Sequence, residues 1–535
     1  MTRHWGLRDV PASRAEAYRS AGWWTDQTLG EVIHAGVAER VGARVAIHSR
    51  TRPFTGTFGE VHAMARSFAS ALADRGVGPG DVVVMQLPNW VEAAVTFWGA
   101  AHLGAVIVPV VHFYGAKELG YVLDTVDPDV VITAASFAGQ DRISPLGHLI
   151  TPERADRWFV VGSGGDPLPH GLHRFEELLD ATPLDEPLRT DPGAPAVIGF
   201  TSGTTRNPKG VIHSHQTLGF EVRQLSAFNP VLGPPPLIGA PVGHFIGMLG
   251  ALLLPFFRIQ PINVIDQWDP AEALRIMLRD ELSLGGGATY FVTSLLDHPD
   301  FTSEHLSLIP SAGIGGSTVP VAATRRLTDL GITCYRAYGS TEHPSTTATV
   351  LDGPEDKRLT TDGCPLEGVE LKLDDHGQIL SRGPDLCIGY TDPDLTAAAF
   401  DEDGWYRTGD IAVLDADGYI TITDRMADVI IRGGENISPA EVEEQLLGIT
   451  GVTEAAVVAV ADDRLGERAV AVVRQADDAP MLTLTAVQEH LAARGLAKQK
   501  WPEAVHIVTD LPRTPSGKVQ KYVLRRQLAE REILT

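Results

Sequence analysis

Residues 201–210, TSGTTRNPKG, combine four hydroxyl side chains, two glycines and one lysine. The loop follows an apolar run at 196–200 and precedes a shorter one at 211–213. Backbone N–H groups, hydroxyl donors and a lysine cation are the groups that hold phosphate oxygens. The Gly-Lys-Ser/Thr ending of a Walker P-loop is absent, because Pro208 stands before Lys209 and glycine follows it. The pattern favours a polyphosphate-binding loop, with an ordinary polar hairpin as the alternative.

Further polar blocks follow this loop along the chain. They are YGSTE at 338–342, WYRTGD at 405–410, DR at 424–425 with IRGGENISPAEVE at 431–443, and PRTPSGK at 512–518. In this order and spacing, and over nearly the whole chain, the set resembles the adenylate-forming superfamily. That superfamily comprises acyl-CoA synthetases, carrier-protein adenylation domains and luciferases.

The resemblance implies a site for ATP. The loop at 201–210 would hold the β- and γ-phosphates, Tyr338 would stack on adenine, and Thr341 would contact the α-phosphate. Asp410 would accept the ribose hydroxyls, with Arg425 as a second ribose contact. The implied ATP- and AMP-binding residues are Thr201, Ser202, Gly203, Thr204, Thr205, Lys209, Gly315, Gly316, Ser317, Tyr338, Gly339, Ser340, Asp410 and Arg425.

Four residues are the implied catalytic groups: Lys518, Thr341, Glu342 and His244. Glu342 would ligate Mg²⁺, a hard cation that prefers oxygen ligands. Lys518 would stabilise the charge that develops as a carboxylate displaces pyrophosphate, which lowers the transition state more than the ground state. His244 matches the position of an aromatic ring beside the acyl pocket, and a histidine packed in the core is the alternative.

The resemblance also implies sites for the acid and for coenzyme A. The walls of the acyl pocket would be Phe245, Ile246, Gly313, Ala337 and Gly339. Because three of these five are Gly or Ala, we expect a bulky or medium-length acid rather than acetate. Gly433 and Gly434 would lie beside the channel for coenzyme A, and Ala427 stands at the hinge position of the family.

Two residues depart from the family pattern. Arg206 replaces a glycine in the phosphate loop, where it would be strained if φ is positive or would add a phosphate contact. Ala427 replaces the usual Asp or Lys of the hinge. Hinge residues need not be polar, so rotation of a C-terminal domain stays compatible with this sequence.

The pattern of the strands and helices that must position these residues predicts an α/β protein. From residue 27 to about 340, short apolar runs alternate with helical stretches, including a capping box formed by Thr57 and Glu60. This pattern predicts a large N-terminal domain, 1–424, of stacked, mostly parallel sheets covered by helices. Short alternating runs within 345–424, at 370–373, 378–382, 411–414 and 419–423, predict a small β-barrel-like unit. Residues 425–535 predict a small mobile α+β domain, with a helix from Ser438.

Charge and composition narrow the classes of partner. The net charge of −24 argues against nucleic acid, although residues 491–535 carry nine Lys/Arg against four Asp/Glu. The apolar stretch 93–111 contains His102, Gly104 and Pro109 and divides into a helix and a strand, so we expect no membrane segment. We expect no signal peptide, and three sparse cysteines fit a reduced cytoplasm. A monomer and a homodimer both stay open.

We therefore expect an AMP-forming acid–CoA ligase that uses ATP, Mg²⁺ and coenzyme A. It looks similar to medium-chain, cyclohexanecarboxylate and aryl acid–CoA ligases. One alternative delivers the acyl group to a carrier protein in trans or to another nucleophile. A second, from another class, is a catalytically silent ligand-binding homologue, against which the intact Lys518, Glu342 and Asp410 argue.

Overall fold

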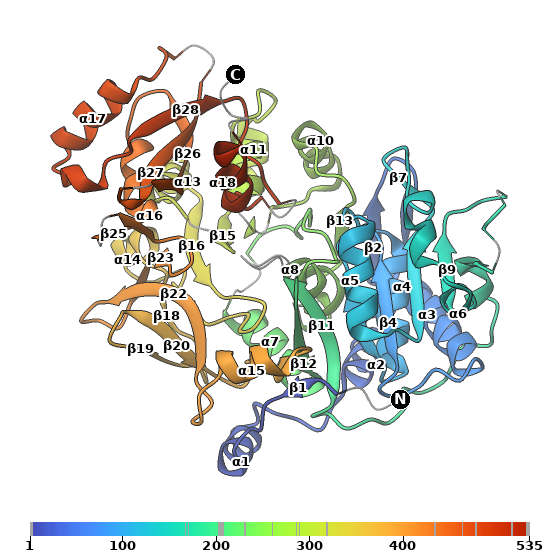
Figure 1. Ribbon diagram of the computed structural model, residues 1–535. Helices are drawn as coiled ribbons and strands as arrows, with labels where there is room; N and C mark the ends of the chain where they lie inside the picture. The colour runs from blue at the N-terminus through green and yellow to red at the C-terminus, as the bar shows by residue number, and fades with distance from the viewer. Residues whose placement is uncertain are drawn as a thin grey trace.

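The computed structural model describes most of the chain, and Figure 1 shows its elements in two groups on either side of a central region. Strands and helices of the N-terminal part (blue to green) lie on one side, and those after residue 400 (orange to red) lie on the other. The described residues are 4–165, 167–169, 171–201, 208–228, 232–258, 260–284, 286–287, 289–316, 319–432, 435–462, 464–476, 479–514 and 517–530.

The largest sheet has nine strands, in the order β1-β21-β12-β11-β5-β4-β6-β9-β10. The six strands from β11 to β10 pair in parallel, and β12, β21 and β1 are added antiparallel at one edge. The strands are β1 (Gly6–Leu7), β21 (Gly389–Tyr390), β12 (Lys209–Ser214), β11 (Pro195–Thr201), β5 (Val106–Pro109), β4 (Val82–Gln86), β6 (Val130–Ala134), β9 (Trp158–Val161) and β10 (His173–Arg174).

Helices cover both faces of this sheet, as the continuous apolar runs predict. Along β4, Val83 and Met85 belong to one core cluster, whereas Val82 and Val84 belong to another. Because successive side chains of a strand point to opposite faces, each face carries its own core. The helices are α2 (Leu29–Glu39), α3 (Phe58–Ala73), α4 (Val91–His102), α5 (Ala116–Val126) and α7 (His215–Phe228). The predicted capping box starts α3, with Thr57 N–H donating to Glu60 Oε2 at 2.8 Å.

A second sheet carries the strand that leads into the YGSTE block. Strands β14 (Gly286–Gly287), β15 (Ser311–Gly315) and β16 (Thr333–Tyr338) pair in parallel, and β17 (Thr347–Ala348) and β18 (Cys364–Pro365) continue antiparallel. Its helices are α10 (Pro270–Asp280), α11 (Thr289–Leu296) and α13 (Val321–Asp329). A small sheet of β13 (Ile262–Ile265), β2 (Arg44–His48) and β3 (Phe54–Thr57) lies beside them. The parallel sheets and their helices agree with the predicted fold class.

The region from residue 345 to residue 425 divides its strands among three sheets. An open antiparallel sheet has the order β19 (Glu370–Leu373), β20 (Gln378–Arg382), β22 (Tyr406–Leu414) and β23 (Ile420–Arg425). The first two strands match their predicted bounds, whereas β22 begins five residues earlier than predicted. Strands β17, β18 and β21 instead join the two larger sheets. These strands have two residues each, which is too short to show an alternating pattern in the sequence.

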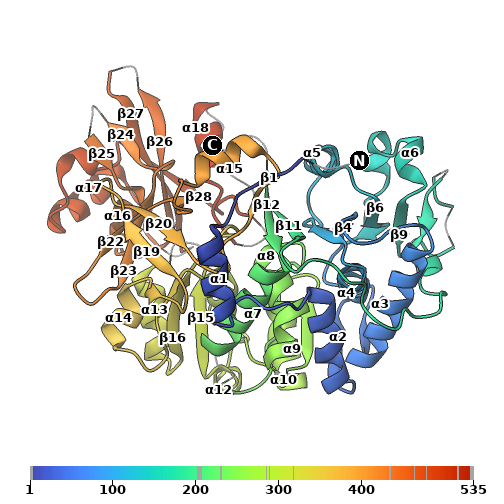
Figure 2. The ribbon, with the colours of Figure 1, turned by 90° about the horizontal axis from the view of Figure 1, so that it is seen from below.

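The C-terminal segment forms a sheet with helices packed on it. Its strands are β24 (Ile430–Arg432), β25 (Glu435–Ile437), β26 (Val452–Asp462), β27 (Gly466–Gln475) and β28 (Ala504–Val508), and its helices are α16 (Pro439–Leu446), α17 (Leu484–Ala493) and α18 (Lys521–Ala529). Ser438 caps α16 as predicted, because its Oγ accepts the N–H of Glu441 at 3.0 Å. Figure 2 shows this segment standing beside β19–β23.

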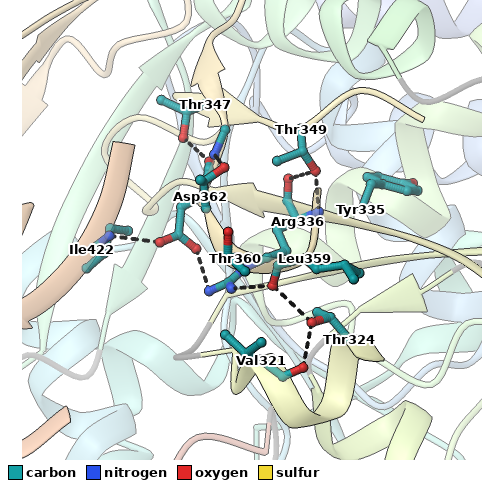
Figure 3. Close-up of polar contacts among 12 residues, drawn as sticks. Val321, Thr324, Tyr335, Arg336, Thr347, Thr349, Leu359, Thr360, Asp362 and Ile422 are labelled. Atoms are coloured by element: carbon teal, nitrogen blue, oxygen red, sulfur yellow. Dashed lines mark hydrogen bonds and ion pairs between the residues drawn. The ribbon is translucent and has the colours of Figure 1, made fainter. Parts of the chain in front are cut away.

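A buried ion pair holds β16 to its neighbours. Arg336 and Asp362 are 2.9 Å apart, with side chains 7% and 10% exposed. The other Asp362 oxygen accepts the N–H of Ile422 in β23 at 2.8 Å, and Arg336 also donates to the Leu359 carbonyl at 3.2 Å. Figure 3 shows Arg336 of β16, Ile422 of β23 and Thr347 of β17 contacting Asp362. The pair therefore fixes the strand that ends at Tyr338.

The apolar stretch 93–111 folds as α4, a turn at Gly104 with φ of +64°, and β5. This agrees with the predicted division into a helix and a strand. Within the part of the chain that the structure describes, no helix has the length and apolar character needed to cross a bilayer.

Candidate active site

A three-residue contact joins the second sheet to the four-stranded sheet. Tyr338, the last residue of β16, donates its hydroxyl to Asp410 Oδ2 at 2.7 Å. Arg425, the last residue of β23, holds Nε 2.9 Å from Asp410 Oδ1, and β22 and β23 pair these residues directly. Burial raises the pKa of Tyr338, and the Asp410 carboxylate raises the pKa of Arg425. A carboxylate that is 2% exposed is thus held by a phenol and a guanidinium.

The turn after β16 presents Thr341 and Glu342. Glu342 is 8% exposed, and its Oε1 accepts the hydroxyl of Tyr390 at 2.9 Å. His213 Nε2 donates to the carbonyl of Thr341 at 2.7 Å, and burial lowers the pKa of His213 to about 4. A carboxylate has about four lone-pair sites, so the bond from Tyr390 leaves Glu342 able to ligate a cation.

Gly339 allows the chain to turn back immediately after Tyr338. A β-carbon at Gly339 would lie 1.8 Å from the carbonyl oxygen of Pro344. The N–H of Ser340 donates to the His343 carbonyl at 2.9 Å and closes the turn. Only glycine permits this approach, so a larger residue at 339 would distort the turn rather than fill a pocket.

The loop predicted to bind polyphosphate connects β11 and β12. Thr201 ends β11, Lys209 begins β12, and the two residues are directly paired. Residues Ser202, Gly203, Thr204, Thr205 and Arg206 lie outside the described residues, as do Ser317, Gly433 and Gly434. The described end of the loop lies near the YGSTE turn, since a β-carbon on Gly199 would contact Thr341 Cγ2 at 3.1 Å. The carboxyl end of a parallel strand is where α/β sheets bind ligands.

One face of β15 and β16 carries small residues. Gly313 pairs with Tyr335 and Gly315 pairs with Ala337, so these four positions share a face. A β-carbon on Gly315 would lie 2.4 Å from the Ala337 carbonyl, whereas Gly316, with φ of +78°, has open space around it. Along this face, Gly315 and Ala337 lie between Tyr335 and the turn.

Tyr335 covers the far end of this small-residue face. A β-carbon on Gly313 would lie 2.5 Å from the phenol of Tyr335. Tyr335 is 2% exposed, and its hydroxyl has no hydrogen-bond partner among the described residues. Its ring contacts Phe228 at a centroid distance of 5.8 Å. A buried phenol with a free hydroxyl therefore closes the space that the glycines leave.

The block around His244 meets the site from short helix α8 (Phe245–Met248). His244 precedes the helix, and burial lowers its pKa to about 4. Phe245 is 7% exposed and packs on the His213 ring at 4.9 Å, whereas Ile246 is 55% exposed. The side chains of these three consecutive residues thus differ in their burial. Their roles in an acyl pocket stay predictions.

The loop that carries Lys518 rests against the N-terminal part of the chain. Gly517 has φ of +85°, and a β-carbon there would lie 2.7 Å from the β-carbon of Tyr290 in α11. The guanidinium of Arg513 lies 5.9 Å from the centre of the Tyr290 ring. Within the loop, Thr514 Oγ1 accepts the N–H of Lys518 at 3.1 Å. A left-handed glycine thus lets the loop approach α11 closely.

The charge of Lys518 interacts electrostatically with the charged residues of the site. Desolvation lowers the pKa of Lys518 to about 8, and Arg425 acts in the same direction. Asp410 and Glu342 oppose this shift, while the Lys518 charge helps to lower the pKa of His244. Lys518 as a whole is exposed, so its ammonium is not enclosed in a core.

Three residues at this site were missed by the sequence reasoning. Tyr390 and His213 hold Glu342 and Thr341, and Tyr335 closes the glycine face. The alternation of β16 places Tyr335 two residues before Ala337, so that signal was present in the sequence. No comparable signal existed for Tyr390, because it reaches Glu342 from a two-residue strand of another sheet.

The comparisons with known proteins all indicate the same family, over most of the chain. A family model described as AMP-binding enzyme matches residues 35–391, and the AMP-binding enzyme C-terminal domain matches 441–518. The medium-chain fatty-acid–CoA ligase of Escherichia coli (strain K12) is 33% identical over 534 residues, covering 97% of this chain and 93% of that protein.

Two further similarities concern a second ligase and a solved structure. A CoA ligase of Rhodococcus jostii (strain RHA1), named for a propanoyl group on a methyl-dioxo-octahydroindene ring, is 34% identical over 491 residues, covering 88% of this chain and 93% of that protein. The crystal structure of ATP-bound MatB from Rhodopseudomonas palustris matches with a TM-score of 0.81 at 27% identity, covering 94% of this chain and 99% of that one.

Proposed function

Because the chain belongs to the family of AMP-binding enzymes, we propose that it is an AMP-forming acid–CoA ligase. It would activate a carboxylic acid with ATP and then transfer the acyl group to coenzyme A. The observation that carries the proposal is the convergence of Tyr338 and Arg425 on Asp410, with the charges of Glu342 and Lys518 acting on the same site. Aromatic, anionic and cationic groups thereby gather where β11 and β16 end.

In the first step, a carboxylate oxygen of the acid attacks the α-phosphorus of ATP. The bond from that phosphorus to the bridging oxygen breaks, and pyrophosphate leaves with the electron pair. We assign adenine stacking to Tyr338 and the ribose hydroxyls to Asp410, whose position Arg425 fixes. Lys518 would stabilise the charge on the phosphate oxygens.

Glu342 is the residue that fits a magnesium ion. Its carboxylate is oriented by Tyr390 and keeps acceptor capacity, and Mg²⁺ prefers one or two carboxylates together with phosphate oxygens. When bound with ATP, Mg²⁺ would neutralise phosphate charge. Thr341, on the adjoining residue of the same turn, would contact the α-phosphate.

In the second step, the sulfur of coenzyme A attacks the acyl carbonyl carbon. AMP leaves with the electron pair of the mixed anhydride bond, and the thiol proton passes to solvent. The basic segment 491–535 supports an anionic acceptor such as coenzyme A, and Gly433 and Gly434 would lie beside its channel. Ala427 would serve as the hinge of the rotation between the two steps.

The proposal is tested by a panel of carboxylic acids assayed with ATP and Mg²⁺, with and without coenzyme A. We expect AMP and pyrophosphate as products, an acyl group that hydroxylamine traps, and an acyl-CoA only when coenzyme A is present. ADP and inorganic phosphate as products would contradict adenylation. Trapped acyl-AMP without any acyl-CoA would instead indicate a carrier protein or another nucleophile as the acceptor.

The length of the accepted acid is expected to depend on Ala337. Ala337→Leu places extra methylenes on the small-residue face, and overpacking of this kind costs about 1–3 kcal/mol. We expect kcat/KM for the longest accepted acid to fall by about 10- to 200-fold, while shorter acids are spared. Tyr335→Ala should act in the opposite direction and admit longer acids.

The matched control for Ala337→Leu is Ala322→Leu on the exposed face of α13. It adds the same side chain away from the site and should leave the acid profile unchanged. If Ala337→Leu also keeps the parent profile, the acid does not lie on this face. Gly339→Leu is unsuitable for the purpose, because its side chain would strike the Pro344 carbonyl.

A further inference from the structure

Three histidines from three helices meet at one point of the N-terminal part. His34 lies in α2, His62 in α3, and His102 is the last residue of α4. Their ring centroids are 5.4, 5.5 and 5.4 Å apart, and one nitrogen of each lies within 4.8 Å of the others. His62 and His102 are 6% and 1% exposed. The three rings form a nearly equilateral triangle, in which His62 and His102 are buried.

The nitrogens of this triangle lack partners. Among the described residues, His34 Nδ1, His62 Nε2 and both ring nitrogens of His102 are buried without a hydrogen bond. Buried polar groups are almost always hydrogen-bonded, so four such atoms in one cluster need a reason.

We propose that His34, His62 and His102 bind one divalent transition-metal ion of the zinc type. Zinc binds imidazole nitrogen at about 2.0–2.1 Å, which puts the ring centroid roughly 3 Å from the metal, so three rings at tetrahedral angles have centroids about 5 Å apart. Nitrogens bound to a tetrahedral zinc are roughly 3.4 Å apart, so these nitrogens, which lie within 4.8 Å of one another, would draw together by up to about 1.4 Å on binding the ion. Three imidazoles suit zinc and its neighbours in the series and do not suit magnesium.

Glu186 lies near the outer nitrogen of His34 and could become its hydrogen-bond partner. His34 Nε2 lies 3.9 Å from Glu186 Oε2, while His34 Nδ1 is the buried nitrogen. A ligating histidine commonly donates its other N–H to a carboxylate, which fixes the tautomer of the ring. His34 would thus bind the metal through Nδ1 and donate Nε2–H to Glu186. Water would complete the four-coordinate shell.

The surroundings of the cluster favour a structural metal. A β-carbon on Gly30, one turn before His34, would lie 2.4 Å from the carbonyl of Ala101, so α2 and α4 approach closely beside the cluster. The carbonyl of His102 accepts the N–H of Leu188 at 2.8 Å, which lays the 184–188 segment across the helix ends. The nearby cation, Arg66, is paired with Asp185 at 2.9 Å.

The cluster is also separate from the site of chemistry. His102 ends α4 just before β5 begins at Val106, whereas the polyphosphate loop begins where the parallel neighbour β11 ends, at Thr201. The histidine cluster therefore lies near the amino-terminal ends of these parallel strands, and the polyphosphate loop lies at their carboxyl-terminal ends. The metal would join α2, α3 and α4 and would not take part in adenylation.

The test uses the full chain, stripped with a chelator and then dialysed against Zn²⁺ with a weak competing chelator. We expect one zinc per chain by elemental analysis, an intense visible spectrum with Co²⁺ typical of four-coordinate nitrogen sites, and a higher melting temperature with Zn²⁺ but not with Mg²⁺. His34→Gln, His62→Gln and His102→Gln should each abolish all three signals. His305→Gln is the matched control, because His305 is buried but both its nitrogens have partners.

Two variants at more exposed positions keep the test valid if the variants at the buried His62 and His102 fail to fold. The side chain of His34 is 28% exposed, so His34→Gln should fold, as circular dichroism would verify. Glu186→Gln, at a side chain that is 80% exposed, should weaken zinc binding by about 10- to 100-fold. The proposal is overturned if the parent chain binds no zinc under competition, or if folded His34→Gln keeps the parent stoichiometry. Neither readout depends on ligase activity.

Discussion

Lys518→Ala is expected to slow acyl-AMP formation by roughly 10²–10³-fold, as loss of one preorganised donor does elsewhere. The charge of Lys518 is coupled electrostatically to Asp410, Glu342 and Arg425, at the site where charge would develop on phosphate oxygens. Thioester formation from supplied acyl-AMP and coenzyme A should be nearly unchanged, because Lys518 would have no part in it. Single-turnover assays of the two half-reactions measure the two effects separately.

The pH profile gives the same prediction a second readout. Because the pKa of Lys518 is lowered to about 8, the free enzyme loses this cation as the pH rises through about 8. The kcat/KM of adenylation, which reports on the free enzyme, should fall over that range in the parent and stay flat in Lys518→Ala. Lys498→Ala, an exposed lysine of the same segment, is the control. Equal losses in both half-reactions for Lys518→Ala would contradict its assigned role.

A hinge variant provides the opposite pattern in the same assays. Ala427 lies in the exposed turn after β23, and Ala427→Pro fixes φ near about −65°. We expect thioester formation to suffer more than adenylation, since the loop of Lys518 already rests on α11. Ala427→Gly should retain both steps. An unchanged thioester rate in Ala427→Pro would exclude rotation at this residue.

Arg336→Met is expected to have the largest effect on stability. It leaves the Asp362 carboxylate buried without its cation, and breaking a buried pair in this way costs about 3–5 kcal/mol. The loss should appear as a lower urea midpoint of the unfolding transition followed by circular dichroism. The nucleotide site should weaken as well, because the pair fixes the strand that ends at Tyr338.

Two comparisons separate charge burial from loss of packing. The double variant Arg336→Met/Asp362→Asn removes both charges and keeps an oxygen that can accept the N–H of Ile422, so it should recover much of the loss. Arg326→Met breaks an exposed pair with Asp297, whose side chains are 45% and 63% exposed, and should cost only about 0–1 kcal/mol. If Arg336→Met and Arg326→Met lower the free energy of unfolding equally, the buried pair contributes no more to stability than the exposed pair.

The sequence predicted local elements better than it predicted which of them meet. The ranges 370–373 and 378–382 and the start of α3 follow from alternation and from a capping box, which are local signals. The contact among Tyr338, Asp410 and Arg425 spans three blocks, and only the resemblance to a known family brought them together. His34, His62 and His102 lie 28 and 40 residues apart on separate helices, a spacing that matches no local motif. The packing of the three helices creates that cluster.

The direct pairing of Asp410 with Arg425 has a mechanical consequence. The turn at 426–428 begins at the next residue, and it is tied back by the N–H of Met426 donating to the Gly409 carbonyl at 2.9 Å. A ribose held by Asp410 would therefore stiffen the end of β23, from which the turn starts, and the middle of β22, which is paired with it. We expect the angular freedom of the C-terminal segment to be smaller with nucleotide bound than without it. Departure of AMP would then be the event that returns the segment to its full range of motion.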